Sequence, residues 1–367
     1  MFDYLLGYMG ISFYSISKEQ KDVIKGIAMV FIVLHNFLHW TNAVGENEMN
    51  FDSNRIYNLF EFIGGDVTRL FNGLFSYFGF YFLELFIFIS GYGLAKYNIN
   101  STTPMYKKYI IPRVIKLYAL LIFGIIVYFF LFYRAFDMEW FTAFVTSSLL
   151  MYNNLSFYRI FMFIGPWWYF SLILQLYILF PLLYKALDRY KEKGFFVLIA
   201  LSYVLIFLLT SIANKWDVPI YGNFLGHLPE FLLGMGCVMF EGLKFTWKVM
   251  IPAMVVFILS NFLEFFFPFS FLSATILMLW FFHAIINMPS NRIMRAFKLL
   301  GVISMFMFLI NGPLRLYTMP YLARGEPLQV LLGSFIHLTI VIMVSYMLSL
   351  LYYKTVEPLT LKLISKL

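Results

Sequence analysis

Residues 114–134 read VIKLYALLIFGIIVYFFLFYR, a stretch with charged side chains only near its two ends. A helix needs about 20 mostly apolar residues to cross the hydrocarbon core of a bilayer. Comparable stretches lie on both sides of it, so that the full set is 22–40, 72–95, 114–134, 167–184, 195–213, 224–241, 249–267, 271–288, 299–318 and 329–353. We therefore predict an all-α polytopic membrane protein with about ten transmembrane helices.

The composition of the 367-residue chain excludes several classes of soluble protein. Hydrophobic residues make up 62% and charged residues 13%, whereas soluble domains average about 25% charged residues. A soluble enzyme, a disordered chain and a nucleic-acid-binding domain are therefore excluded. The only cysteine, Cys237, excludes an internal disulfide, and we find no HExxH motif or carboxylate pair at metal-ligand spacing. We expect no metal site.

The basic residues alternate between two sides of the predicted helices. One side collects 20 of the 27 Lys and Arg residues, and the positive-inside rule makes it cytoplasmic, together with the N and C termini. The high Phe, Tyr and Ile content is typical of AT-rich bacterial genomes, so we expect a multi-pass protein of a bacterial cytoplasmic membrane.

We expect one transmembrane domain over residues 1–367, with no appended soluble domain. Residues 1–20 form a cytoplasmic or interfacial N-terminus in this prediction. The apolar run 141–164 is interrupted by Asn153, Asn154 and Arg159, which indicates an interfacial or re-entrant segment.

Two ionisable residues lie deep inside predicted helices, where polar side chains are costly and point to function. His35 follows Lys25 by ten residues, about 15 Å along the helix and near the middle of the membrane. His39 follows one turn later, and Glu84 lies near the middle of the second span. A His–Glu pair would suit general base catalysis, so we expect His35 and Glu84 to be catalytic. The alternatives are a His bonded to a helix carbonyl and a Glu that bridges two helices.

Basic residues mark the predicted cytoplasmic end of the third span. Arg113 and Lys116 share one helical face, and Lys25 lies at the cytoplasmic end of the first span. Such a patch suits the phosphates of a coenzyme A ester, and ordinary positive-inside anchoring gives the same pattern.

Residues at the predicted outer ends are candidates for binding an acceptor. Trp168 and Tyr169 suit a sugar or a lipid, and they equally fit an interfacial aromatic belt. Asn311 and Arg315 lie one turn apart and form a polar helix face.

Three further histidines accompany these candidates. Glu230, which we also expect to bind the acceptor, follows His227 by three residues, so the two side chains could instead pair with each other. We expect structural roles for the isolated His283 and His337.

Six short motifs, in order along nearly the whole chain, resemble those of the acyltransferase family 3 membrane proteins. They are Lys25-Gly26-Ile27-Ala28 with His35, the stretch 84–92 ending in Ser-Gly-Tyr, and the stretches 113–118, 167–181, 228–236 and 300–304. The resemblance implies transfer of an acyl group, commonly acetyl, from cytoplasmic acyl-CoA to a hydroxyl of a cell-surface or lipid-linked glycan. His35 would be the base or the acyl carrier, and the partners would be acyl-CoA, the glycan acceptor and membrane lipid. The oligomeric state, a homo-oligomer included, stays open.

Two positions depart from the family pattern. The spacing from Lys25 to His35 is one residue shorter than in the family, which places the two about 80° apart around the helix, whereas Lys21 lies about 40° from His35. The donor contact could therefore fall to Lys21 or Lys25, with Arg113 and Lys116 beside them. Asn311 stands where the family often has His.

Two other functions are consistent with these residues. A carrier or flippase for a glycan or lipid intermediate would need the same aromatic outer mouth, and a membrane-embedded sensor would need only a binding site. We favour the acyltransferase, since it alone requires turnover of acyl-CoA.

Overall fold

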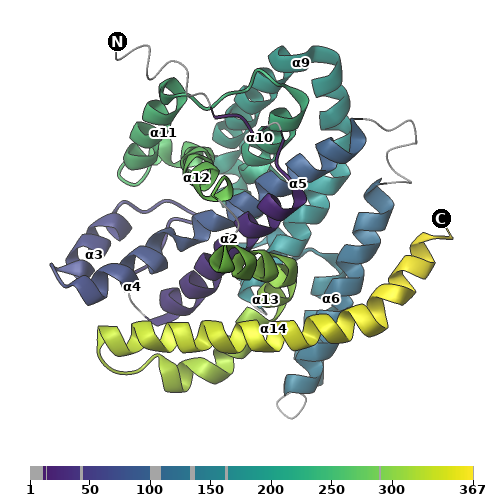
Figure 1. Cartoon of the computed structure of the whole chain (residues 1–367). Helices are drawn as coiled ribbons and strands as arrows, with labels where there is room; N and C mark the ends of the chain where they lie inside the picture. The colour runs from purple at the N-terminus through teal and green to yellow at the C-terminus, as the bar shows by residue number, and fades with distance from the viewer. Residues whose placement is uncertain are drawn as a thin grey trace.

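The computed structural model describes residues 11–13, 15–41, 44–99, 109–132, 137–161, 164–288 and 291–366. Helices dominate this part of the chain, and its only β pairing is an isolated bridge between Ile11 and Phe245 (Figure 1). The α-helices are α2 (Lys18–Leu38), α3 (Asn54–Ile63), α4 (Val67–Phe78), α5 (Leu83–Asn98), α6 (Ile111–Phe132), α7 (Met138–Leu150), α8 (Phe157–Ile160), α9 (Trp168–Lys215), α10 (Leu228–Met239), α11 (Trp247–Leu259), α12 (Ser270–Ile286), α13 (Arg292–Leu322) and α14 (Pro327–Ile364).

Seven helical segments of the described residues are long and apolar enough to cross a membrane: Lys18–Thr41, Val67–Asn98, Ile111–Leu131, Gly165–Lys215, Glu264–Ile286, Arg292–Leu322 and Pro327–Ile364. The chain is therefore a multi-pass membrane protein. Two further predicted spans correspond to the shorter apolar helices Phe224–Met239 and Trp247–Leu259.

One long segment contains two predicted spans. Helix α9 has a non-helical residue at Lys191, with φ 52° and ψ −139°. The helical parts before and after this residue line a common apolar cavity, with Leu179 on one and Leu209 on the other. The chain therefore turns back at Lys191. The number of ten crossings and the cytoplasmic location of both termini stay predictions.

Helix α2 lies in the middle of the molecule, with α5 and α13 on either side (Figure 1). Glycines bring α2 and α13 together: a Cβ on Gly301 would lie 1.7 Å from the Asp22 carbonyl oxygen, and one on Gly26 would lie 1.9 Å from that of Phe297. Small residues at such crossings let helix backbones approach closely in membranes. The contact fixes the height of α2, and hence of His35, against α13.

The second predicted span is broken in the structure. Helices α4 and α5 are separated by a short 3-10 helix, η2 (Gly79–Phe82). A Cβ on Gly79 would lie 2.4 Å from the Cβ of His35, so only glycine allows this backbone approach. Irregular backbone at membrane depth is tolerated where protein surrounds it or where it lines a cavity. The break therefore lies directly against the predicted catalytic histidine.

The segment predicted as interfacial or re-entrant contains most of α7, then the 3-10 turn η5 (Asn153–Leu155) and the short helix α8. Asn153 and Asn154 are buried, and the Asn154 amide donates a hydrogen bond of 2.9 Å to the Trp168 carbonyl. These contacts fix the start of α9. In the predicted N-terminal region 1–20, residues 1–10 and 14 lie outside the described residues, and α2 begins within it at Lys18, capped by the Ser17 side chain.

Candidate active site

A cavity of about 170 Å³ lies at the carboxyl end of α2. Its polar lining comes from α2, from the loop that follows α2, from the start of α9 and from the second half of α13. The polar residues and tryptophans of this lining are His35, Asn36, His39, Trp40, Glu46, Glu48, Trp168 and Arg315. Three residues predicted from the sequence, His35, Trp168 and Arg315, therefore meet in one cavity.

His35 is held by a backbone contact. Its Nδ1 lies 3.1 Å from the carbonyl oxygen of Phe75, which also accepts the N–H of Gly79. A carbonyl only accepts hydrogen bonds, so Nδ1 carries the proton and the neutral ring has its lone pair on Nε2. His35 is therefore fixed in the tautomer in which Nε2 can accept a proton.

Two acidic residues of the loop after α2 also line the cavity. Glu46 forms an ion pair with His39. Burial alone would raise the pKa of Glu46, but the hydrogen bond from His39 brings it below its ordinary value. Removal from water and the nearby Glu46 carboxylate raise the pKa of Glu48 to about 8. The cavity thus holds one ionised and one protonated carboxyl group at neutral pH.

Arg315 brings a positive charge to the cavity. Its guanidinium donates a hydrogen bond of 2.8 Å to the Asn36 carbonyl and lies 4.4 Å from the centre of the Trp40 ring. Asn311, one turn earlier, instead accepts a hydrogen bond of 3.0 Å from Nε2 of His337. The two predicted neighbours therefore separate, with Arg315 at the cavity and Asn311 in the interior.

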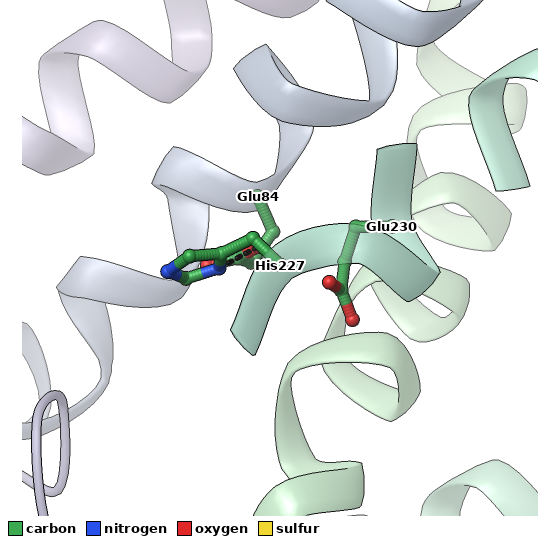
Figure 2. Close-up of side chains that lie close together, drawn as sticks. All are labelled: Glu84, His227 and Glu230. Atoms are coloured by element: carbon green, nitrogen blue, oxygen red, sulfur yellow. Dashed lines mark hydrogen bonds and ion pairs between the residues drawn. The ribbon is translucent and has the colours of Figure 1, made fainter. Parts of the chain in front are cut away.

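The sequence led us to expect a pair between Glu84 and His35, but the structure does not form it. The Glu84 carboxylate lies 3.0 Å from Nδ1 of His227, and the same imidazole makes a 2.6 Å contact to the Tyr221 carbonyl through Nε2 (Figure 2). Glu230 could have paired with His227 by its spacing, but neither of its oxygens has a hydrogen-bond partner among the described residues. The Trp168 ring stacks on His227 at 5.8 Å, so this cluster lies behind the cavity wall.

A second cavity, of about 160 Å³, lies nearer the amino end of α2. It is lined by Lys25, Ser90, Tyr169, Tyr177 and Ser304, together with apolar residues. Lys25 also forms an ion pair of 2.7 Å with Asp22. Tyr169 was expected beside Trp168 at the outer acceptor site, yet it lines this other cavity because neighbouring residues of a helix point in different directions.

The predicted donor-binding cations gather near this second cavity. Lys25, Lys96 and Arg113 lie close enough to repel the Lys21 ammonium electrostatically, and Lys21 lies 5.3 Å from the centre of the Tyr92 ring. Lys116 is exposed on α6. The structure therefore brings Lys21, Lys25 and Arg113 together.

The two cavities follow one another along the same four helices. Helices α2, α5, α9 and α13 contribute to both, with Lys25 and His35 from α2 and Tyr169 and Trp168 from α9. Phe308 lines the His35 cavity, and its ring lies 5.3 Å from that of Tyr169, which lines the other. Aromatic rings therefore separate the two cavities.

The family model described as an acyltransferase domain, that of acyltransferase family 3, matches residues 20–354. The chain belongs to this family. No curated protein and no solved structure matches it. The match covers every residue that lines the two cavities.

Sequence reasoning did not single out Glu46, Glu48 and Trp40 of this acyltransferase as site residues. They lie in or beside the loop after the first span, where acidic and aromatic residues are ordinary. Only the folding of that loop over the carboxyl end of α2 brings them to His35.

Proposed function

We propose that the protein is an integral-membrane O-acyltransferase of the bacterial cytoplasmic membrane. It transfers an acyl group, acetyl in our proposal, from cytoplasmic acyl-CoA to a hydroxyl of a cell-surface or lipid-linked glycan. The observation that carries the proposal is His35, whose Nδ1 faces the Phe75 carbonyl and whose ring lines a cavity. The family match supports the reaction class.

In this reaction Nε2 of His35 accepts the proton of the acceptor hydroxyl. The hydroxyl oxygen attacks the thioester carbonyl, and the Arg315 guanidinium stabilises the negative charge that develops on the carbonyl oxygen. The C–S bond then breaks, and the proton passes from His35 to the leaving CoA thiolate. The products are the acylated glycan and free CoA.

The second cavity supports entry of the donor from the cytoplasmic side. Lys21, Lys25 and Arg113 gather there, and cations of this kind bind the phosphates of coenzyme A. Because the two cavities lie along the same helices, the acyl-bearing arm of the donor would pass between them to reach His35.

A wide hollow near the His35 cavity supports a glycan acceptor. It has a volume of about 680 Å³ and combines the rings of Phe51, Phe207 and Tyr221 with the polar groups of Asn214 and Glu264. Aromatic faces beside hydrogen-bonding groups suit the apolar faces and hydroxyls of a sugar.

The direct test is turnover of labelled acetyl-CoA by the purified protein in nanodiscs, with release of free CoA as the readout. We expect His35→Ala to lose activity by about 10²–10⁴-fold, the range that a general base contributes. His283→Ala is the matched control, since His283 lies outside both cavities. Equal activity in His35→Ala and the wild type, both well folded, would reject the role of His35.

A further inference from the structure

Glu84, His227 and Glu230 form a buried cluster that the proposed acyl transfer does not use. They come from α5, from the end of the 3-10 helix η8 (Phe224–His227) and from the first turn of α10. One ligand atom from each lies within 4.8 Å of the others (Figure 2). Each side chain is at most 2% exposed, so the cluster has no access to bulk water.

The hydrogen bonds of His227 leave a charge unexplained. Nε2 faces the Tyr221 carbonyl and must carry a proton, because a carbonyl only accepts. Nδ1 lies 3.0 Å from the Glu84 carboxylate. With the proton on Nε2, the lone pairs of Nδ1 and of the carboxylate oxygen would repel each other, so a positive charge has to lie between these two atoms. It is either a proton shared between the imidazole and the Glu84 carboxyl group or a metal ion. A metal-binding histidine commonly donates its other N–H to a backbone carbonyl, as His227 does here.

Glu230 distinguishes these two possibilities. Both of its oxygens are buried without a hydrogen-bond partner among the described residues. A proton on one oxygen would make Glu230 neutral, but the other oxygen would still have no donor, and an unsatisfied buried group is costly. A cation would instead satisfy the oxygens and balance the charge, since two carboxylates and a neutral imidazole carry −2.

We infer that Glu84, His227 and Glu230 bind a divalent metal ion, and that the ion is zinc. Imidazole and carboxylate groups are usual zinc ligands. The ligand atoms of one tetrahedral zinc ion lie about 3.4 Å apart, so the Glu230 carboxylate turns inward on binding. The inference goes against the sequence, which gave no metal pattern because Glu84 is distant from His227 along the chain.

The ion has a structural role. It joins α5 to η8 and α10 behind Trp168, whose ring stacks on His227 and forms a wall of the His35 cavity. It lies outside that cavity and takes no part in the transfer step.

The test is the metal content of the purified full-length protein. The protein is incubated with zinc sulfate, separated from free metal by gel filtration and analysed by mass spectrometry. We expect about one zinc per chain in the wild type and at least about fivefold less in Glu230→Gln. Glu264→Gln, which alters an exposed acid, and His283→Gln are controls that keep the metal.

A second measurement covers the case in which Glu230→Gln does not fold. The wild type is loaded with cobalt(II), which gives visible d–d absorption when protein ligands surround it in a tetrahedral site. Zinc should then displace the cobalt and remove the absorption. Wild-type protein that retains no zinc and shows no cobalt absorption would overturn the inference and show that two protons neutralise the cluster. Neither readout needs a substrate, so the result is independent of the acyltransferase proposal.

Discussion

The chemistry proposed for the His35 cavity depends on a few residues whose partners are backbone atoms. The Phe75 carbonyl fixes the proton of His35, and the Asn36 carbonyl fixes the guanidinium of Arg315. Backbone partners cannot turn away as side chains can, so the base and the cation keep their places without substrate. This is the preorganisation that stabilises charge in a transition state.

Arg315 should be needed for the rate of transfer. We expect Arg315→Gln to lower kcat by about 10²–10³-fold, the loss seen when one group that stabilises an oxyanion is removed. Arg315→Lys keeps the charge but loses the planar contact with Trp40, so it should recover only part of the rate. Acetyl-CoA turnover checks both variants. Arg324→Gln, which alters an exposed arginine, is the control. An equal loss of kcat in Arg324→Gln would contradict a specific role for Arg315.

Glu48 should make the stability of the protein depend on pH. Its pKa of about 8 in the folded protein lies above its ordinary value of 4.5, so the folded state binds more protons than the unfolded state between these values. Stability therefore falls as pH rises from about 4.5 to 8. We expect the Tm of the wild type, measured relative to that of Glu48→Gln, to decrease as the pH rises from 5 to 9. A constant difference between the two, or the same pH response in the exposed-site control Glu61→Gln, would contradict this.

The distance of His35 from Lys25 along one helix could be predicted from the sequence, because both residues lie on α2 and a helix has a fixed rise per residue. The partner of Glu84 could not. Glu84 and His227 are 143 residues apart, and their contact depends on the crossing of α5 and α10. At that crossing a Cβ on Gly91 would lie 2.2 Å from the Phe231 carbonyl oxygen.

At the scale of elements, the break between α4 and α5 is the feature that positions the base. Apolar length indicated a helix over 72–95 but could not show where it is interrupted, since η2 is as apolar as its neighbours. Apolar length did separate the two halves of α9, since the predicted spans 167–184 and 195–213 lie on either side of the non-helical residue Lys191. Sequence periodicity finds helices of this kind, and tertiary contact decides their breaks.

Gly79→Ala tests the role of the break. The added Cβ would lie 2.4 Å from the Cβ of His35, so either η2 or His35 has to move. A displacement of about 1 Å in a catalytic group costs about 10²-fold in rate, and we expect at least a tenfold fall in CoA release with donor binding unchanged. Gly93→Ala is the matched control, because no heavy atom lies within 4 Å of its Cβ position. Full activity in Gly79→Ala would show that the backbone contact does not position His35.

At the scale of the whole molecule, the order of the two cavities along α2 suggests a direction across the membrane for the proposed reaction. The cavity with Lys25 lies toward the amino end of α2 and the cavity with His35 toward its carboxyl end. Rings of Tyr169 and Phe308 separate them. A donor that enters beside Lys25 and an acceptor that enters beside Arg315 would therefore meet at His35 from opposite sides.

This direction predicts which face of the membrane consumes acetyl-CoA. Acetyl-CoA carries several charges and does not cross a bilayer unaided. The native Cys237 is buried. In two separate variants, Lys193→Cys and Arg324→Cys, the introduced cysteine is exposed. A maleimide that cannot cross the membrane then labels this cysteine in proteoliposomes. Labelling before and after addition of detergent gives the fraction of molecules that present each residue to the outside. We expect the turnover of external acetyl-CoA, relative to the total after permeabilisation, to equal the fraction labelled at Lys193→Cys. Turnover that follows the Arg324→Cys fraction would place donor entry at the opposite end of α2 and reverse the assignment of the two cavities.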